Sequence, residues 1–158
     1  FISIFYNQVV YPKNINQKRV IDEAYALYVA GFDFPSKNHI GLLNLVKILD
    51  RKKFPYKIIC AGNADKYSKN FNLIKKKVVE LSLSERVILM ANVNQNTMES
   101  LYANCEFTIY PSLYEGFGRP IVESVTYGKK VFSSDVGIFS ELKENKLVLP
   151  LSELNKFK

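Results

Sequence analysis

Two glutamates stand eight residues apart around a glycine-containing loop, in the stretch EGFGRPIVE from Glu115 to Glu123. Pro120 suits the first turn of a helix, where unpaired backbone N–H groups and the helix dipole attract an anion such as a phosphate. Gly116 and Gly118 allow the backbone to approach a ligand closely. Because a carboxylate accepts paired hydrogen bonds from vicinal hydroxyls, the stretch suits a ligand that carries phosphates and a sugar together.

Each of these features alone has a plainer explanation. Two glutamates at this spacing are most often unrelated surface charges, and a Gly-Phe-Gly sequence before a helix is often only a tight turn. The surrounding chain helps to decide, because a phosphate site of this kind needs a strand that runs into the loop and a helix that follows it.

Short apolar runs alternate with longer helical patterns from about Ala24 onward, which is typical of the strand-helix units of a parallel sheet. Right-handed connections place such units in a doubly wound α/β sheet of about five or six strands with helices on both faces. Ligands of such a sheet bind beyond the carboxyl ends of its strands. The predicted strands are residues 25–30, 57–61, 86–90, 107–110 and 130–133, with a last strand at 147–149.

Four helices are predicted between these strands. Asn94 caps the third helix, and Pro120 and Gly128 bound the fourth. The third helix turns Met98, Leu101 and Tyr102 inward. Apolar residues at helical spacing mark the first two helices, which carry Leu42, Leu45, Val46 and Leu49 on the first and Tyr67, Phe71, Ile74, Val78 and Leu81 on the second.

The chain divides into one expected domain and two flanking segments. Residues 25–150 form the domain, residues 1–24 are an interdomain connection with a strand-like segment at 2–6, and residues 151–158 are a truncated C-terminal segment.

The chain of 158 residues carries a net charge of +7, which favours an anionic partner without choosing among nucleic acid, a membrane surface and a phosphorylated substrate. Its aromatic residues fall mainly in core-like positions, whereas a nucleic-acid surface interleaves exposed aromatic and basic residues, so a nucleic-acid-binding domain ranks last. Cys60 and Cys105 lack the paired spacing of a metal or redox site, and we expect buried, reduced thiols. No apolar stretch reaches the roughly 20 residues of a membrane span.

The segment at residues 110–136, YPSLYEGFGRPIVESVTYGKKVFSSDV, resembles the E-x(7)-E motif of the retaining GT-B glycosyltransferases of the group 1, or family 4, type. Residues 30–38, AGFDFPSKN, resemble the same family's glycine-ended first strand and lysine-bearing loop. The resemblance covers nearly all of residues 25–149. It implies the C-terminal, donor-binding half of an enzyme with two Rossmann-like domains, whose N-terminal acceptor domain is absent here.

The resemblance implies specific roles for the acidic and basic residues. Lys37 matches the lysine that pairs with the donor diphosphate, and Glu115 matches the acid that faces the transferred sugar, so both are catalytic candidates. Glu123 matches the acid that holds the ribose hydroxyls. Asn92 and Val93 fall in the region that usually cradles the base.

The loop between the two glutamates has an implied role of its own. Phe117, Gly118 and Arg119 match positions whose backbone amides face the sugar and phosphates, and Gly116 completes the predicted nucleotide-sugar-binding set. Phe117 and Tyr114 are expected to serve in packing rather than as sugar platforms.

One position departs from the family pattern. Phe32 stands where the family commonly has an arginine that helps to neutralise the diphosphate, and phenylalanine cannot replace that charged fork. Arg119 occupies a position that is more often apolar, and our hypothesis is that it supplies part of the missing charge. His39, the single histidine, lies beside Lys37 at the expected helix start, where a surface or capping role is about as plausible as a phosphate contact.

The resemblance implies transfer from a UDP-, GDP- or ADP-sugar with retention, no metal and no other cofactor. The sequence agrees in lacking an Asp-x-Asp pair and a His or Cys cluster with metal spacing. The acceptor would be a saccharide or glycolipid bound mainly by the absent domain, in bacterial polysaccharide or glycolipid synthesis. We expect the fragment alone to be inactive and the enzyme to be cytoplasmic, with peripheral contact to an anionic inner membrane as an option. The alternative is a non-catalytic nucleotide-binding module.

Overall fold

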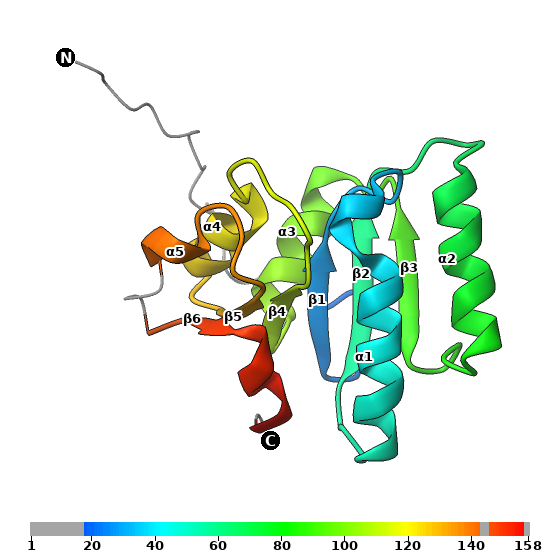
Figure 1. Ribbon diagram of the computed structural model, residues 1–158, viewed down its shortest axis with the longest axis horizontal. Coiled ribbons are helices and arrows are strands. Elements are labelled where there is room, and N and C mark those ends of the chain that lie inside the picture. The colour runs from blue at the N-terminus through cyan, green and yellow to red at the C-terminus, as the bar shows by residue number, and fades with distance from the viewer. Residues whose placement is uncertain (1–17, 143–145, 157–158) are drawn as a thin grey trace.

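The computed structural model describes residues 18–142 and 146–156. Within these residues six parallel strands form one sheet in the order β3-β2-β1-β4-β5-β6 (Figure 1). This arrangement confirms the predicted α/β sheet. The strands are β1 (Tyr25–Val29), β2 (Lys57–Gly62), β3 (Val87–Ala91), β4 (Phe107–Tyr110), β5 (Lys130–Ser133) and β6 (Val148–Pro150).

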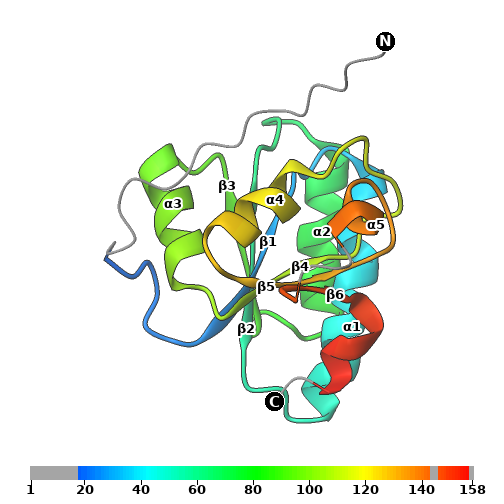
Figure 2. The same ribbon diagram turned by 90° about the vertical axis from the view of Figure 1, so that its left-hand side faces the viewer.

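Helices cover both faces of the sheet, as predicted. Figure 2 shows α1 and α2 on one face and α3 and α4 on the other. The helices are α1 (His39–Arg51), α2 (Lys69–Glu80), α3 (Gln95–Asn104), α4 (Arg119–Thr126) and the short α5 (Phe139–Leu142), with 3-10 helices η1 (Pro35–Lys37) and η2 (Leu151–Lys156).

The central strands β1, β2 and β4 are buried on both faces because helices pack on each side of the sheet. Successive residues of β1 therefore point to different halves of the core. Ala26 and Tyr28 belong to the larger hydrophobic cluster, which includes the buried side chains of α1 and α2. Tyr25 and Leu27 belong to the second cluster, with Leu101 of α3. The apolar runs of the sequence are explained by this two-sided burial.

Most predicted element boundaries are confirmed within a residue. The bounds of β4 and β5 agree at both ends with the prediction. Asn94 caps α3, since its Oδ1 accepts a hydrogen bond of 2.9 Å from the backbone N–H of Thr97. Pro120 lies in the first turn of α4, and Gly128 follows that helix with a φ of 68° that favours glycine. These local signals depend on nearby residues alone, which explains their success.

The prediction for Tyr67 was wrong. Helical spacing predicts it on the inward face of the second helix, but α2 begins only at Lys69 and Tyr67 is 78% exposed. Ser68 caps the helix by accepting a hydrogen bond from the backbone N–H of Phe71. The backbone N–H of Tyr67 instead donates to Asp65 Oδ1 at 2.8 Å, in the turn before the helix. The inward face is formed by Ile74 and Val78.

Three further expectations concern the cysteines, the segment at residues 2–6 and membrane-spanning helices. Cys60 and Cys105 are free and buried, as predicted. The strand-like segment predicted at residues 2–6 lies outside the described residues. In residues 18–142 and 146–156, none of the helices combines the length and the apolar character needed to cross a bilayer.

The strand order determines where a ligand can bind. β1 pairs on one side with β2 and on the other with β4, so successive connections diverge between β1 and β4. Such a switch point opens a crevice at the carboxyl ends of the strands. The loop that carries Lys37 follows β1, and the loop that carries Glu115 follows β4.

Candidate functional site

A cleft of about 460 Å³ lies at the carboxyl ends of β1 and β2, beside the start of α4. It brings together residues from five separate parts of the sequence. Its lining residues are Val29, Ala30, Gly31, Lys37, Gly62, Asn63, Met98, Arg119, Pro120 and Glu123.

Lys37 and Glu115 form the closest ion pair between the two loops. Lys37 Nζ donates to Glu115 Oε2 at 2.7 Å, and the side chains are 24% and 11% exposed. The other oxygen, Oε1, accepts a hydrogen bond of 2.7 Å from Ser112 Oγ. Each oxygen of the Glu115 carboxylate therefore has a donor, and the pair holds a lysine at the rim of the cleft.

Hydrogen bonds to backbone carbonyls tie the same two loops together. The N–H of Leu113 donates to the carbonyl of Ser36 at 2.8 Å, and Asn38 Nδ2 donates to the carbonyl of Pro111 at 2.9 Å. The buried Tyr28 hydroxyl donates to the carbonyl of Lys37. These bonds fix the position of the Lys37 backbone, and therefore the position from which its side chain extends.

The start of α4 is open to a ligand because of its cap. Gly118 is the N-cap with a φ of 90°, in the left-handed region, and it offers no side chain to the first N–H groups of the helix. Those N–H groups and the helix dipole favour an anion. Arg119 and Pro120 of the same turn line the cleft.

Gly137 supports the loop before α4, a role that the sequence did not indicate. It has a φ of 59°, and a Cβ built there would lie 2.9 Å from both Glu115 Cβ and the Phe117 carbonyl oxygen. The Phe117 carbonyl also accepts a hydrogen bond of 2.8 Å from the N–H of Ile138. The backbone of Gly137 therefore packs directly against the loop that carries Glu115.

Glu123 borders the cleft from the second turn of α4. Tyr102, on α3, donates its hydroxyl to Glu123 Oε2 at 3.0 Å. Arg119 Nη2 lies 3.5 Å from Glu123 Oε1, one helical turn away, and the Arg119 side chain is 60% exposed. Burial strongly raises the pKa of Tyr102, with smaller contributions from Tyr110 and Glu123, so the phenol stays protonated.

Phe32 does not face this cleft. It is fully buried, with its ring centroid 4.6 Å from that of Phe71 and 5.0 Å from that of His39. The phenylalanine at the position where the resemblance implies an arginine is therefore a core residue. Lys37 and Arg119 are the charged basic residues that line the cleft.

Neither the surface role nor the capping role considered for His39 is correct. The helix cap is Asn38, whose Oδ1 accepts a hydrogen bond from the N–H of Gly41 at 3.2 Å. His39 is buried against the rings of Tyr28 and Phe32. Burial, helped by the charge of Lys37, lowers its pKa to about 4. A neutral, packed imidazole is the consequence.

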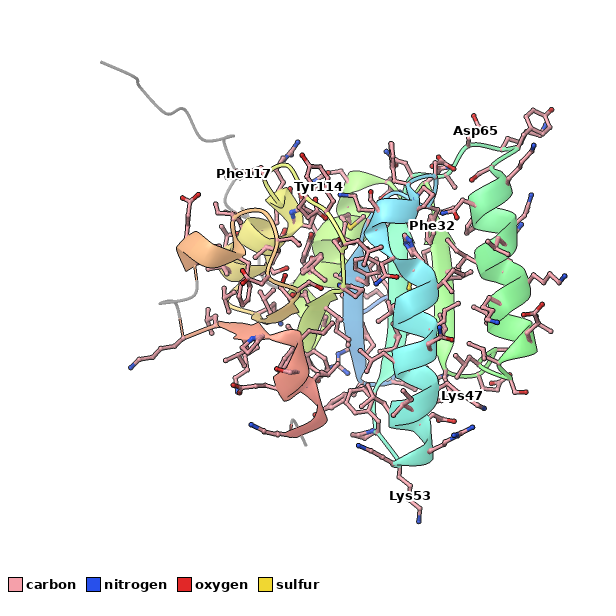
Figure 3. The ribbon with its side chains drawn as sticks, in the orientation of Figure 1. Phe32, Lys47, Lys53, Asp65, Tyr114 and Phe117 are labelled. Carbon is pink, nitrogen blue, oxygen red and sulfur yellow. The ribbon has the colours of Figure 1, made fainter. Side chains whose placement is uncertain are left out.

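The residues that line the cleft do not include six of the predicted site residues: Asn92, Val93, Glu115, Gly116, Phe117 and Gly118. Glu115 is joined to the cleft through its ion pair with the lining residue Lys37. Asn92 uses its side chain to bond the backbone N–H and carbonyl of Ala64, and Val93 follows it. Gly116 is exposed, and Phe117 is partly buried against the core, which confirms its packing role. Tyr114 is 71% exposed, so the packing role expected for it was wrong. It projects from the upper end of the molecule in Figure 3.

Residues that the sequence analysis missed complete the cleft, among them Gly62 and Met98. A Cβ at Gly62 would lie 2.0 Å from the carbonyl oxygen of Ala30, so only glycine allows β1 and β2 to approach here. The signal for Gly62 in the sequence is a glycine at the end of an apolar strand.

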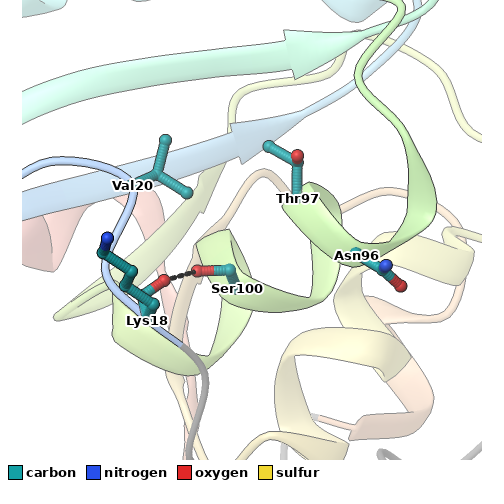
Figure 4. A pocket seen from close by; sticks show the side chains of 5 residues that line it. All are labelled: Lys18, Val20, Asn96, Thr97 and Ser100. Carbon is teal, nitrogen blue, oxygen red and sulfur yellow. Dashed lines mark hydrogen bonds between the residues drawn. The ribbon is translucent and has the colours of Figure 1, made fainter.

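A second hollow of about 490 Å³ lies between the start of the described chain and α3 (Figure 4). Its charged lining residue is Lys18, and the hydroxyl of Ser100 already donates to the Lys18 carbonyl at 2.6 Å. Acidic and basic side chains converge on the first cleft instead, which makes it the candidate site. In the described parts of the chain, no group of three or more His, Cys, Asp or Glu side chains could hold a metal ion.

Solved structures share this fold. The Anabaena protein HepE, solved in complex with UDP and glucose, superposes with a TM-score of 0.69 at 21% identity, over 85% of this chain and 37% of that chain. At this level of identity the likeness establishes the fold.

Two curated proteins have a higher sequence identity to this chain than HepE has. The chain is 30% identical over 144 residues to the O-antigen chain mannosyltransferase RfbU of Salmonella typhimurium, which covers 91% of this chain and 38% of the relative. It is 32% identical over 122 residues to the O-antigen chain mannosyltransferase B of Escherichia coli, which covers 76% of this chain and 31% of the relative. The chain thus spans roughly a third of the length of these relatives. Residues 11–147 match the family described as glycosyl transferases group 1, and with the doubly wound sheet and its cleft this match shows that the chain belongs to that family.

Proposed function

We propose that this chain binds the nucleoside-diphosphate-sugar donor of a group 1 glycosyltransferase, and that the whole enzyme transfers the sugar with retention of configuration. The observation that carries the proposal is the convergence of Lys37, Arg119, Glu123 and the open start of α4 on one cleft. A ligand with both phosphates and vicinal hydroxyls matches this set of groups.

The diphosphate would bind between Lys37 and the start of α4. Lys37 carries a positive charge, the start of α4 carries a partial positive charge, and both line the cleft. As the bond between the sugar and the diphosphate breaks, negative charge grows on the departing phosphate oxygen. Lys37, Arg119 and the helix N–H groups would stabilise that charge without a metal ion.

The two carboxylates would bind the two sugars of the donor. Glu123 would accept hydrogen bonds from the ribose hydroxyls, because an ionised carboxylate is an acceptor only. Glu115, held by Lys37 and Ser112, would face the transferred sugar. The pairing of Lys37 with Glu115 would then link the diphosphate position to the sugar position.

The proposed reaction is the one that the family resemblance implies. The acceptor hydroxyl attacks the anomeric carbon from the side of the leaving group, the bond to the phosphate oxygen breaks, and that oxygen takes the proton of the hydroxyl. The sugar is thereby transferred with retention. No protein nucleophile is needed for this sequence of bond changes.

The names of the relatives guide the choice of substrate. Two of them are O-antigen chain mannosyltransferases, which supports a mannosyl donor and a polysaccharide product for this enzyme too. We propose a cytoplasmic enzyme whose acceptor, a saccharide or glycolipid, is bound mainly by the part of the protein outside this chain.

The second candidate is a nucleotide-binding module without turnover. The burial of Phe32 favours it, because the arginine common in the family is missing and its position has become part of the core. Such a module would bind a nucleoside diphosphate in the same cleft but would transfer no sugar from any donor in the full-length protein.

Calorimetric titration with UDP, GDP and ADP in the presence of EDTA tests the proposal. We expect saturable binding of one nucleotide, weakened at least tenfold by Glu123→Ala. Glu85→Ala is the matched control, because Glu85 is exposed in the turn before β3, away from the cleft. Absence of binding up to millimolar concentrations would contradict a donor site. Binding without transfer by the full-length protein would favour the second candidate.

A further inference from the structure

Tyr102 links the interior of the protein to the candidate site. It lies in α3, its side chain is buried in the second hydrophobic cluster, and its hydroxyl donates to Glu123 Oε2 at 3.0 Å. We propose that Tyr102 is a positioning residue, which holds the Glu123 carboxylate in the orientation that binds the ribose hydroxyls of the donor. This inference rests on the proposed function, because it assigns a determinant of that same site.

The tyrosine ring is itself held in place. It stacks on the ring of Tyr127 with centroids 5.2 Å apart and an interplanar angle of 15°. The same helix places Leu101 in the core beside it. A buried aromatic side chain with a stacked neighbour has little freedom to move. Its hydroxyl therefore offers Glu123 a donor at a fixed position.

The backbone of α4 is fixed near Glu123 by a second tyrosine. The hydroxyl of Tyr110 lies 3.0 Å from Ser124 Oγ, which in turn donates to the Pro120 carbonyl at 2.7 Å. Ser124 follows Glu123 directly. Two buried tyrosines thus bond to adjacent residues of α4. Tyr110 bonds to Ser124, which bonds to the helix backbone, and Tyr102 bonds to the Glu123 carboxylate.

The hydrogen bond has a specific consequence for the carboxylate. A glutamate side chain has several rotatable bonds, and ordering it on ligand binding costs entropy. With Oε2 bound to Tyr102, the carboxylate is already ordered, and Oε1 remains beside Arg119 at 3.5 Å. Without the Tyr102 hydroxyl, the carboxylate would be free to swing toward Arg119 and away from a diol.

This role is tested by comparing nucleotides with and without ribose hydroxyls. The probes are UDP, GDP and ADP and their 2′,3′-dideoxy forms, titrated into the full chain. We expect Tyr102→Phe to weaken binding of the ribonucleotide about tenfold and binding of its dideoxy form less than twofold. The ratio of the two affinities is independent of the fraction of folded protein, so partial unfolding of the variant would not produce this result.

Two further variants sharpen the comparison. Tyr127→Phe removes the hydroxyl of the stacked ring but leaves the bond to Glu123, and it should leave the affinity ratio unchanged. In a Glu123→Ala background, Tyr102→Phe should have no additional effect on the ratio. A non-additive result of this kind shows that the two residues act through one another.

The outcomes separate this inference from the function on which it rests. If the wild-type chain binds none of UDP, GDP and ADP, the proposed donor site fails and the role of Tyr102 fails with it. If the wild-type chain binds but Tyr102→Phe weakens the ribonucleotide and the dideoxynucleotide equally, only the positioning role is overturned. An unchanged affinity for both probes, or an equal effect of Tyr127→Phe, overturns it as well.

Discussion

Lys37 Nζ lies 2.7 Å from Glu115 Oε2, although the two residues are 78 positions apart in the sequence. One follows β1 and the other follows β4, and these strands are neighbours in the sheet. The ion pair therefore joins the two loops at the point where the connections of the sheet diverge. In the proposed site, it places the diphosphate contact and the sugar contact side by side.

Replacing Lys37 by alanine should weaken nucleoside-diphosphate binding by ten- to a hundredfold, because a hydrogen bond to a charged group contributes about 1.5–3 kcal/mol. Lys57→Ala is the matched control. Lys57 also forms an ion pair, with Glu23 at 2.8 Å, but at the amino end of β2. Calorimetry should show an unchanged affinity for the control, and equal losses in both variants would contradict a local role for Lys37.

Replacing Arg119 by alanine should weaken diphosphate binding about three- to tenfold, with the larger loss at low ionic strength, since an exposed charge is screened by salt. Arg119 lines the cleft, whereas Arg51 lies exposed at the far end of α1. Arg51→Ala therefore serves as the control in the same titration. Unchanged diphosphate affinity in Arg119→Ala would refute the idea that this residue compensates for the arginine missing at position 32.

Restoring the arginine common in the family should harm this protein. Phe32 is fully buried between the rings of Phe71 and His39, so Phe32→Arg would bury a charge without a partner. We expect a loss of roughly 3–5 kcal/mol in the free energy of unfolding and no gain in diphosphate affinity. Phe32→Leu, measured in the same urea titrations, should lose less. A stable Phe32→Arg variant with tighter binding would show that position 32 can reach the cleft.

Gly137 and Gly128 separate backbone strain from damage to the site. Both have positive φ values, of 59° and 68°, so alanine strains the backbone at either position by roughly 1 kcal/mol. A Cβ at Gly137 would also lie 2.9 Å from Glu115 Cβ, whereas a Cβ at Gly128 meets nothing within 4 Å. We expect Gly137→Ala to weaken binding of the nucleotide sugar and Gly128→Ala to leave it unchanged. Equal affinities in the two variants would argue against contact between Gly137 and the Glu115 loop.

His39 should make the protein less stable in mild acid. Its pKa is lowered by burial and by Lys37 to about 4, from an ordinary value of 6.5. The unfolded chain binds the proton more readily, so the stabilisation is complete above about pH 6.5 and is lost as the pH falls toward 4. We expect this contribution to reach roughly 3 kcal/mol. Urea unfolding at several pH values gives the free energy of unfolding as a function of pH. This free energy should fall less steeply toward acid pH in His39→Leu than in the wild type, and identical pH dependence would contradict the burial of a neutral imidazole.

Local sequence signals predicted the elements and the glycine-bounded loop of this protein. The alternation of apolar runs and helical spacing predicted the strands, because two-sided burial makes most residues of each strand apolar. Asn94 and Pro120 marked helix starts through contacts within a single turn. The wrong prediction for Tyr67 has a local cause too. The spacing of apolar residues does not show at which residue the helix begins, and the cap at Ser68 sets that start.

The tertiary structure decided which of the candidate residues meet. Strand order brings Lys37 to Glu115 and α3 to α4, and apolar periodicity does not determine that order. The burial of Phe32 and His39 depends on α1 and α2 packing side by side, where Phe71 completes their aromatic cluster. The hydrogen bond from Tyr102 to Glu123 arises in the same way, from two helices on one face of the sheet. The sequence by itself determined the residues available for chemistry, and only long-range packing decided which of them face the cleft and which became core.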